Sequence, residues 1–213
     1  MMEKEKIKDI VEWGYCIVIA LVLALLFRFF IGTPTIVKQR SMFPTLIENQ
    51  RLILNRTFRI TKKMPKRGDI ITFEAPSPSR IYDKWSADQS NPVAIYDEEP
   101  TNIFSKFIYY GLEITKKSYI KRTIGLPGEH VKIENGKVYI NGEELEEDYL
   151  DDDVVTETEA FYDFIVPDGY IFAMGDNRSK STDCRELGCI PVNKLEGIVV
   201  YRFWPLNALG KIK

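Results

Sequence analysis

The N-terminal part of the chain contains a long apolar segment, which restricts the fold more than any other feature of the sequence. Residues 13–27 contain no charged side chain, and apolar residues continue to position 31 beyond Arg28. A helix needs about 20 apolar residues to cross a bilayer, and an arginine near its end can extend its charge to the headgroups. The segment therefore predicts a transmembrane helix.

Two other interpretations of this segment are weaker. A cleaved signal peptide has an apolar core of about 7–15 residues that ends in small residues, whereas this segment ends in the aromatic-rich sequence RFFIGTPT. A helix that is apolar on all sides is either buried or in lipid, and lipid better explains one at the N-terminus. We divide the chain into an N-terminal segment (residues 1–9), an anchor (10–31) and a folded domain (32–213).

The charges that flank the anchor leave its orientation open. Positive residues favour the cytoplasmic side of a membrane. Three lysines precede the apolar segment, and Arg28, Lys38 and Arg40 lie at its end or after it. The two counts are nearly even, and they favour a cytoplasmic N-terminus only weakly.

The composition excludes several classes of function. The formal net charge is −2, which gives no reason to expect a nucleic-acid partner. The chain has three cysteines and one histidine, His130, too few for a zinc site built from these residues. We expect no metal ion and no cofactor.

The domain after the anchor has the pattern of a mostly β protein. Short segments rich in Ile, Leu, Val and Phe alternate with Gly and Pro, and this pattern is typical of strands and turns. In residues 131–145 the pair Asn135-Gly136 supplies a hairpin turn that needs positive φ. The predicted strand segments cover residues 51–56, 68–76, 118–125, 131–145, 161–177 and 197–205.

Two segments do not follow the strand pattern. Residues 77–117 resemble an insertion, a loop followed by apolar residues at helical spacing from Phe104 onwards, with Thr101 or Asn102 as a cap. Such a stripe usually packs on a core, and the alternative is a helix that lies on the membrane surface. The acidic run 143–153 lacks the ligand spacing of a calcium loop, so we expect a solvated loop.

Ser41, in the sequence KQRSMFPTL, is a candidate nucleophile that needs a base. His130 follows a Pro-Gly turn, and nothing around it indicates a catalytic role. A lysine can act as the base if burial keeps it neutral. Lys121 lies in an apolar, strongly β-forming segment, but pattern alone does not single it out among 29 Lys and Arg residues.

Four segments in order resemble the motifs of type I signal peptidases: SMFPTL (41–46), RGDIITF (67–73), YIKRTIGLPGE (119–129) and GDNRSKSTDCR (175–185). The anchor just before the first motif is also typical of that family, and FWPLN (203–207) resembles its C-terminal sequence. The resemblance implies a signal-peptidase-like, all-β catalytic domain. It also implies a membrane-bound serine endopeptidase that removes signal peptides from secretory preproteins.

The resemblance assigns roles to individual residues. Ser41 matches the nucleophile, Lys121 the general base, and Ser181 the serine that orients the lysine amine. The family's paired charges that brace the site correspond to Arg122 with Asp176 and to Asp183 with Arg185. The implied topology places the N-terminus in the cytoplasm and the catalytic domain outside, on the far side of the plasma membrane.

Other residues of the groove are expected from their positions beside these motifs. An extended substrate is expected near residues 37–39 and 118–120, where shallow pockets would accept only small side chains. The predicted lining residues are Val37, Met42, Leu46, Tyr119 and Ile120. Gln39 stands where some members carry a serine that helps to bind the oxyanion, and Cys184 stands where the family commonly has serine.

Two other functions remain as alternatives. One is a self-cleaving serine–lysine protease, and the other is a catalytically inactive, membrane-tethered binding module.

Cys184 and Cys189 lie five positions apart. In an oxidising compartment they form either a disulfide or two free thiols.

Overall fold

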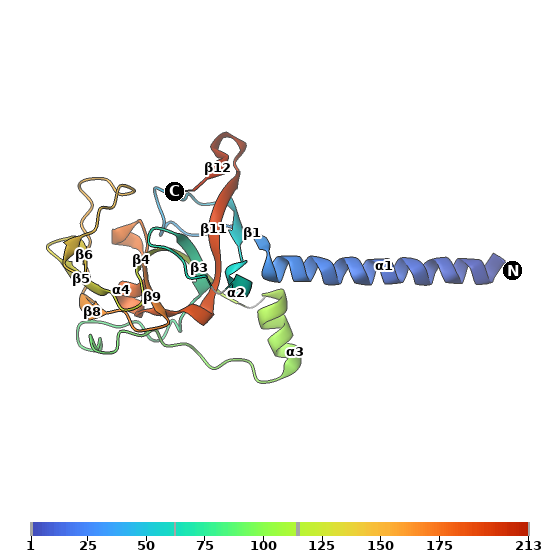
Figure 1. The fold of residues 1–213 in the computed structure, drawn as a ribbon, viewed down its shortest axis with the longest axis horizontal. Helices are drawn as coiled ribbons and strands as arrows, with labels where there is room; N and C mark the ends of the chain where they lie inside the picture. The colour runs from blue at the N-terminus through green and yellow to red at the C-terminus, as the bar shows by residue number, and fades with distance from the viewer. Residues whose placement is uncertain (1, 62, 114–115, 213) are drawn as a thin grey trace.

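The computed structural model describes residues 2–61, 63–113 and 116–212. Helix α1 (Met2–Phe30) projects away from a β-rich domain (Figure 1). Within the described residues, one helix is long and apolar enough to cross a membrane, over Lys8–Phe30, and its most apolar stretch is not buried against the domain. The N-terminal apolar segment therefore forms a helix whose side chains are exposed in a way that suits a lipid environment. This helix ends where the domain begins.

The domain consists of two antiparallel sheets, which confirms the mostly β fold class. In the described residues the larger sheet has the order β1 (Gly32–Ile36), β2 (Arg51–Asn55), β11 (Leu195–Trp204), β3 (Ile70–Glu74), β4 (Ser118–Gly125), β9 (Tyr170–Met174) and β10 (Ile190–Pro191), with β12 (Gly210–Lys211) paired to β11. The smaller sheet has the order β7 (Glu143–Glu144), β6 (Lys137–Ile140), β5 (His130–Glu134) and β8 (Asp163–Ile165).

The short helices connect these strands. They are α2 (Phe58–Thr61), α3 (Ile103–Lys106), the π-helix η1 (Phe107–Leu112), α4 (Cys184–Leu187) and the 3-10 helices η2 (Arg178–Lys180), η3 (Val192–Lys194) and η4 (Leu206–Ala208). The predicted hairpin is present as β5 and β6, and its turn residues Asn135 and Gly136 have φ of 52° and 80°. The segment 161–177 forms two strands, β8 and β9, because Pro167 and Gly169 form a turn between them. The φ of Gly169 is 79°.

Two apolar clusters hold the domain together. The larger cluster takes residues from both sheets, including Phe73 and Phe172 from the larger sheet and Val131 and Phe164 from the smaller. The smaller cluster lies under the segment that carries Ser41. Strand β4 joins the two regions, and from Lys121 onwards it is buried on both faces. A lysine on a half-exposed strand would reach water, whereas Lys121 is 2% exposed.

The insertion, residues 77–117, has the predicted order of loop and helix. The side-chain oxygen of Asn102 caps α3 by accepting a hydrogen bond from the Ser105 backbone N–H at 2.7 Å. The interpretation of its apolar stripe as a packed face is wrong for the start of the helix, where Ile103 and Phe104 are 88% and 70% exposed. The loop of the insertion lies against the domain, where the ring centroids of Tyr82 and Phe161 are 5.0 Å apart.

Candidate active site

Ser41 and Lys121 lie next to each other although 80 positions separate them in the sequence. Ser41 is in the turn segment that follows β1, and Lys121 projects from β4. Lys121 Nζ is 2.7 Å from Ser41 Oγ, within hydrogen-bond distance. A serine hydroxyl paired with an amine in this way can pass its proton to the amine if the amine is neutral.

Burial makes a neutral Lys121 accessible near physiological pH. Removal of the ammonium from water lowers the pKa of Lys121 from 10.5 to about 8, and the negative charge of Asp183 offsets only part of this effect. The side chain is almost fully enclosed, so solvent screens this shift little. The pKa of the Lys121 amine is therefore well below that of a lysine in water.

The segment 175–177 fixes the backbone around Ser41. Asn177 donates its backbone N–H to the Ser41 carbonyl oxygen and its side-chain amide to the Arg40 carbonyl oxygen, each at 3.0 Å. A Cβ atom on Gly175 would lie 2.4 Å from the Ser41 carbonyl oxygen and 2.1 Å from Ser181 Oγ. Only glycine permits this close approach.

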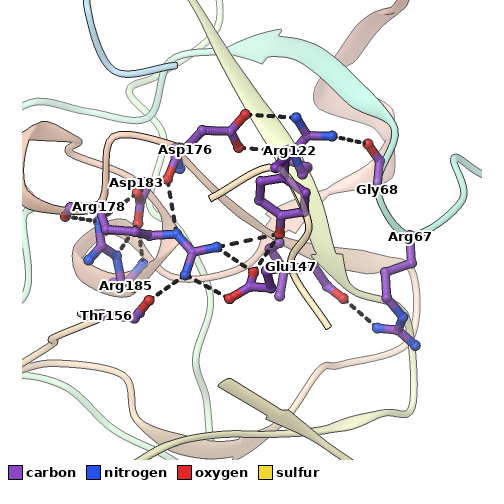
Figure 2. Close-up of polar contacts among 12 residues, drawn as sticks. Arg67, Gly68, Arg122, Glu147, Thr156, Asp176, Arg178, Asp183 and Arg185 are labelled. Carbon is purple, nitrogen blue, oxygen red and sulfur yellow. Dashed lines mark hydrogen bonds and ion pairs between the residues drawn. The ribbon is translucent and has the colours of Figure 1, made fainter. Parts of the chain in front are cut away.

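Two buried ion pairs brace the same segment (Figure 2). Arg122 makes a bidentate pair with Asp176, Nε to Oδ1 at 2.9 Å and Nη2 to Oδ2 at 2.7 Å, and also donates to the Gly68 carbonyl oxygen at 2.9 Å. Asp183 accepts from Arg185 Nε at 2.9 Å and from the Gly175 backbone N–H at 2.9 Å. The pairs expected from the resemblance are thus in contact: Arg122–Asp176 connects β4 to the segment that supports Ser41, and Asp183 connects that segment to α4.

Asp183 stays ionised although it is fully buried. Burial alone raises the pKa of this carboxyl group, but the hydrogen bonds and charge of Arg185, together with the Gly175 N–H, hold the pKa below its ordinary value. Asp183 also caps α4 by accepting from the Arg185 backbone N–H at 3.1 Å. One carboxylate therefore anchors both the glycine beside Ser41 and the helix that follows.

Ser181 lies at the site, but not in the contact that we expected from the resemblance. Its Oγ is buried near Gly175, beside the Ser41 backbone. Among the described residues, this oxygen makes no hydrogen bond to Lys121 Nζ. Its role in orienting the amine stays a prediction.

A groove of about 410 Å³ opens beside Ser41. Of the predicted substrate-binding residues, the following line it: Val37, Met42, Tyr119 and Ile120, with Gln39 next to the serine. Leu46 is fully buried in the cluster beneath the groove, so it supports the groove rather than lining it. The apolar character of the Met42–Leu46 segment made these positions look equivalent in the sequence.

Two strand edges border the groove. In the described sheet β1 pairs with β2 alone, so its other edge is open. Residues 118–120 of β4 pair with β3, and the pairing of β4 with β9 begins only at Arg122. Open edges of this kind can add backbone hydrogen bonds to an extended peptide.

A buried arginine beside the site was not predicted. Arg178 is 4% exposed and donates to the Gly175 carbonyl oxygen at 3.2 Å, while its guanidinium is paired with Glu147 and contacts Thr156 (Figure 2). Tyr149 packs on the Arg122 guanidinium, 3.8 Å from the ring centroid. The acidic run 143–153 is therefore not only a solvated loop. The only sequence signal was one tyrosine among its acidic residues.

Glu147→Gln is expected to lower the free energy of unfolding by about 3 kcal/mol, because it leaves the charge of Arg178 buried without a counter-ion. We also expect a lower kcat, since Arg178 holds the Gly175 carbonyl group. Thermal unfolding and peptide cleavage measure the two effects. Glu146→Gln, a change at the exposed neighbouring position, is the matched control. Equal behaviour of the two variants would contradict this assignment.

His130 and two cysteines remain, and of these Cys184 lies between Asp183 and Arg185 and interacts electrostatically with Lys121. His130 is in β5 of the smaller sheet and pairs with Asp163 at 2.6 Å, with both side chains more than 40% exposed. Cys184 and Cys189 are buried free thiols, and burial raises the pKa of both. Among the described residues no group of His, Cys, Asp and Glu side chains is arranged to hold a metal ion.

The fold and the site define a class of protein. A β domain that carries a serine beside a buried lysine, in a groove with open strand edges, is suited to a serine peptidase that binds extended peptides. The family model "Signal peptidase, peptidase S26" matches residues 10–204. The chain belongs to this family and is a serine peptidase, a hydrolase.

Several curated relatives match over nearly the whole chain. The chain is 33% identical to signal peptidase I P of Bacillus subtilis subsp. natto, over 100% of both chains. It is also 33% identical to signal peptidase I T of Bacillus subtilis (strain 168), over 99% of this chain and 93% of that protein. A crystal structure of a signal peptidase I from Enterococcus faecalis V583 is 30% identical, with a TM-score of 0.39, and covers 64% of this chain and 97% of its own.

Proposed function

We propose that the protein removes signal peptides from secretory preproteins through an acyl-enzyme, with Ser41 as nucleophile and Lys121 as general base. The observation that carries this proposal is the distance of 2.7 Å between Lys121 Nζ and Ser41 Oγ at a buried position. The lowered pKa of Lys121 supports the role of base, because a neutral amine is available at a moderate pH.

The reaction follows from these two groups. Ser41 Oγ attacks the carbonyl carbon of the scissile bond while Lys121 Nζ takes the hydroxyl proton. Lys121 then gives this proton to the leaving amine, the C–N bond breaks, and an ester to Ser41 remains. In the second half, Lys121 takes a proton from water, hydroxide attacks the ester, and Ser41 recovers its proton. Each half passes through an oxyanion, which the Ser41 backbone N–H and the Gln39 side-chain amide would stabilise.

Substrate selection is assigned to the groove. The peptide would lie extended between the open edges of β1 and of residues 118–120, which supply backbone hydrogen bonds. Small side chains such as those of Ala-x-Ala would enter shallow pockets lined by Val37, Met42 and Ile120, and larger side chains would be excluded by steric conflict. The braces Arg122–Asp176 and Asp183–Arg185 would hold the geometry fixed, and Ser181 would orient the amine.

The domain arrangement is part of the same proposal. Residues 1–9 would lie in the cytoplasm, residues 10–31 would cross the plasma membrane once, and the catalytic domain, residues 32–213, would lie outside. The apolar character of Lys8–Phe30, whose most apolar window has no buried residue, supports a lipid environment for this helix. Protease added to intact spheroplasts should digest the domain, and complete protection would refute this orientation.

Cleavage of a purified preprotein tests the function itself. The full chain in detergent should release many copies of a mature protein cut after an Ala-x-Ala sequence, and an acid quench should trap an acyl group on Ser41 that mass spectrometry locates. A single self-cleavage without turnover would favour the self-cleaving protease. No product at all would favour the inactive binding module.

The pH dependence of kcat/KM should follow the ionisation of Lys121. Because burial lowers its folded-state pKa to about 8, the amine is protonated below that pH and cannot accept the Ser41 proton. We expect kcat/KM to rise about tenfold per pH unit below about pH 8 and to level off above it. A peptide assay from about pH 6 to about pH 10 measures the profile, provided that the fold is stable throughout. A midpoint near that of an ordinary lysine would contradict the assignment.

A further inference from the structure

The first turn of the insertion helix presents an apolar face that the domain does not cover. Ile103, Phe104 and Phe107 are 88%, 70% and 50% exposed, and their spacing puts them on one side of the continuous helix formed by α3 and η1. Three large apolar side chains gathered on an exposed face mark an interaction site.

The other end of this helix is fixed to the point where α1 leaves the domain. Arg28, in the last turn of α1, donates to the Leu112 carbonyl oxygen at 3.1 Å and lies 3.5 Å from the Glu113 carboxylate. Arg56 of the domain forms a bidentate pair with the same carboxylate, both distances being 2.9 Å. Tyr109 adds a hydrogen bond to Glu74 at 2.9 Å. The helix therefore has a defined place beside the end of the anchor.

The direction of the helix matches that of a membrane surface. In Figure 1, α3 (light green) lies beside the base of α1 and runs across the direction of α1. If α1 crosses the bilayer, a helix that runs across its base lies along the bilayer surface. The exposed Lys106 lies between Phe104 and Phe107 in sequence. A lysine next to apolar side chains at a membrane surface can extend its ammonium group to the lipid phosphates.

We propose that α3 and η1 form a membrane-surface helix whose residues Ile103, Phe104 and Phe107 insert between the headgroups of the outer leaflet. The inference rests on the proposed function in one respect, the transmembrane placement of α1. A domain held to the bilayer by a single anchor is free to tilt relative to the bilayer surface. The surface helix adds a second contact, which holds the groove beside Ser41 at one orientation relative to the bilayer.

Lipid-dependent quenching tests the placement. The full chain with Cys16→Ser is labelled with a polarity-sensitive fluorophore at Phe104→Cys, at Leu21→Cys in α1, or at Ile165→Cys, the last being 61% exposed on the smaller sheet. The native Cys184 and Cys189 are buried and do not react without denaturant. The proteins are placed in vesicles of phosphatidylcholine and phosphatidylglycerol with bromine atoms on the acyl chains.

The three probes separate the possible outcomes. We expect bromolipid to quench the probes at positions 21 and 104 but not the probe at position 165. Quenching at 21 without quenching at 104 would overturn the surface helix and leave the anchor intact. No quenching at 21 would refute the anchor and the inference with it. Quenching at 104 that depends on protein density instead of bromolipid would show that the face binds a second copy of the chain.

Activity gives an independent test. Ile103→Glu with Phe104→Glu replaces the two most exposed residues of the apolar face, and acidic residues at the start of a helix do not weaken the helix. Loss of the second membrane contact should lower cleavage of a preprotein embedded in the same vesicles about tenfold, whereas cleavage of a short soluble Ala-x-Ala peptide should stay within about twofold. Ile165→Glu is the control and should alter neither rate. Equal effects on both substrates would overturn the proposal.

Discussion

Lys121→Arg should abolish peptide cleavage as completely as Lys121→Ala. Both variants are expected to lose about four orders of magnitude in kcat/KM, which is typical of the loss of a nucleophile's base. Arginine keeps the positive charge and most of the length, but its guanidinium stays protonated at any accessible pH and cannot accept the Ser41 proton. If Lys121 acted only through its charge, arginine would retain much of the activity.

Ser41→Ala defines the background rate for this comparison. Because Ser41 and Lys121 act as a unit, Ser41→Ala combined with Lys121→Ala should be no slower than either single variant. Steady-state kinetics with a soluble Ala-x-Ala peptide measures the wild type and all four variants, and circular dichroism establishes that each is folded. A substantially active Lys121→Arg enzyme would refute the base and with it the proposed mechanism.

Gly175→Ala should lower kcat by about two orders of magnitude, the loss that a misplacement of catalytic groups by about 1 Å can cause. The added methyl group conflicts with the Ser41 carbonyl oxygen and with Ser181 Oγ, at 2.4 Å and 2.1 Å, so the backbone around Ser41 or Gly175 must shift. Overpacking of this kind also costs about 1–3 kcal/mol of stability. Peptide kinetics and thermal unfolding separate the two effects.

Gly142→Ala is the matched control. Gly142 has φ of 88° and open space around it, on the turn before β7. Alanine there strains the backbone and lowers stability but touches no residue of the site. A Gly175→Ala enzyme with the kcat of Gly142→Ala would show that the close approach at Gly175 does not position the nucleophile.

Much of the fold could be predicted from local patterns. The apolar segment, the Asn135-Gly136 hairpin and the strands from 51 to 204 depend on residues close in sequence, and each is present. The segment 161–177 shows the limit of this approach, because Pro167 and Gly169 divide it. The order of the sheet was not accessible, since the pairing of β11 with β2 and β3 joins segments more than a hundred positions apart.

The site was predicted less directly. Residue patterns alone left Lys121 as one of 29 basic residues, and only the order of four motifs distinguished it. Arg178 and Glu147 were missed because their importance comes from burial, and nothing in an acidic run tells a buried glutamate from solvated ones. Burial also explains why the prediction for Leu46 was wrong: Met42, four positions earlier, lines the groove, whereas Leu46 lies beneath it.

The position of β11 has a consequence for when the enzyme becomes active. In the described sheet, β11, a strand late in the chain, lies between β2, next to the serine segment, and β3, next to the lysine strand. Residues 175–177, which include the Asn177 N–H that donates to the Ser41 carbonyl oxygen, are also late in the chain. A polypeptide still being synthesised lacks these parts, so the strands next to its serine and its lysine are not yet held together. Proteolytic competence therefore arrives with the last strands of the domain.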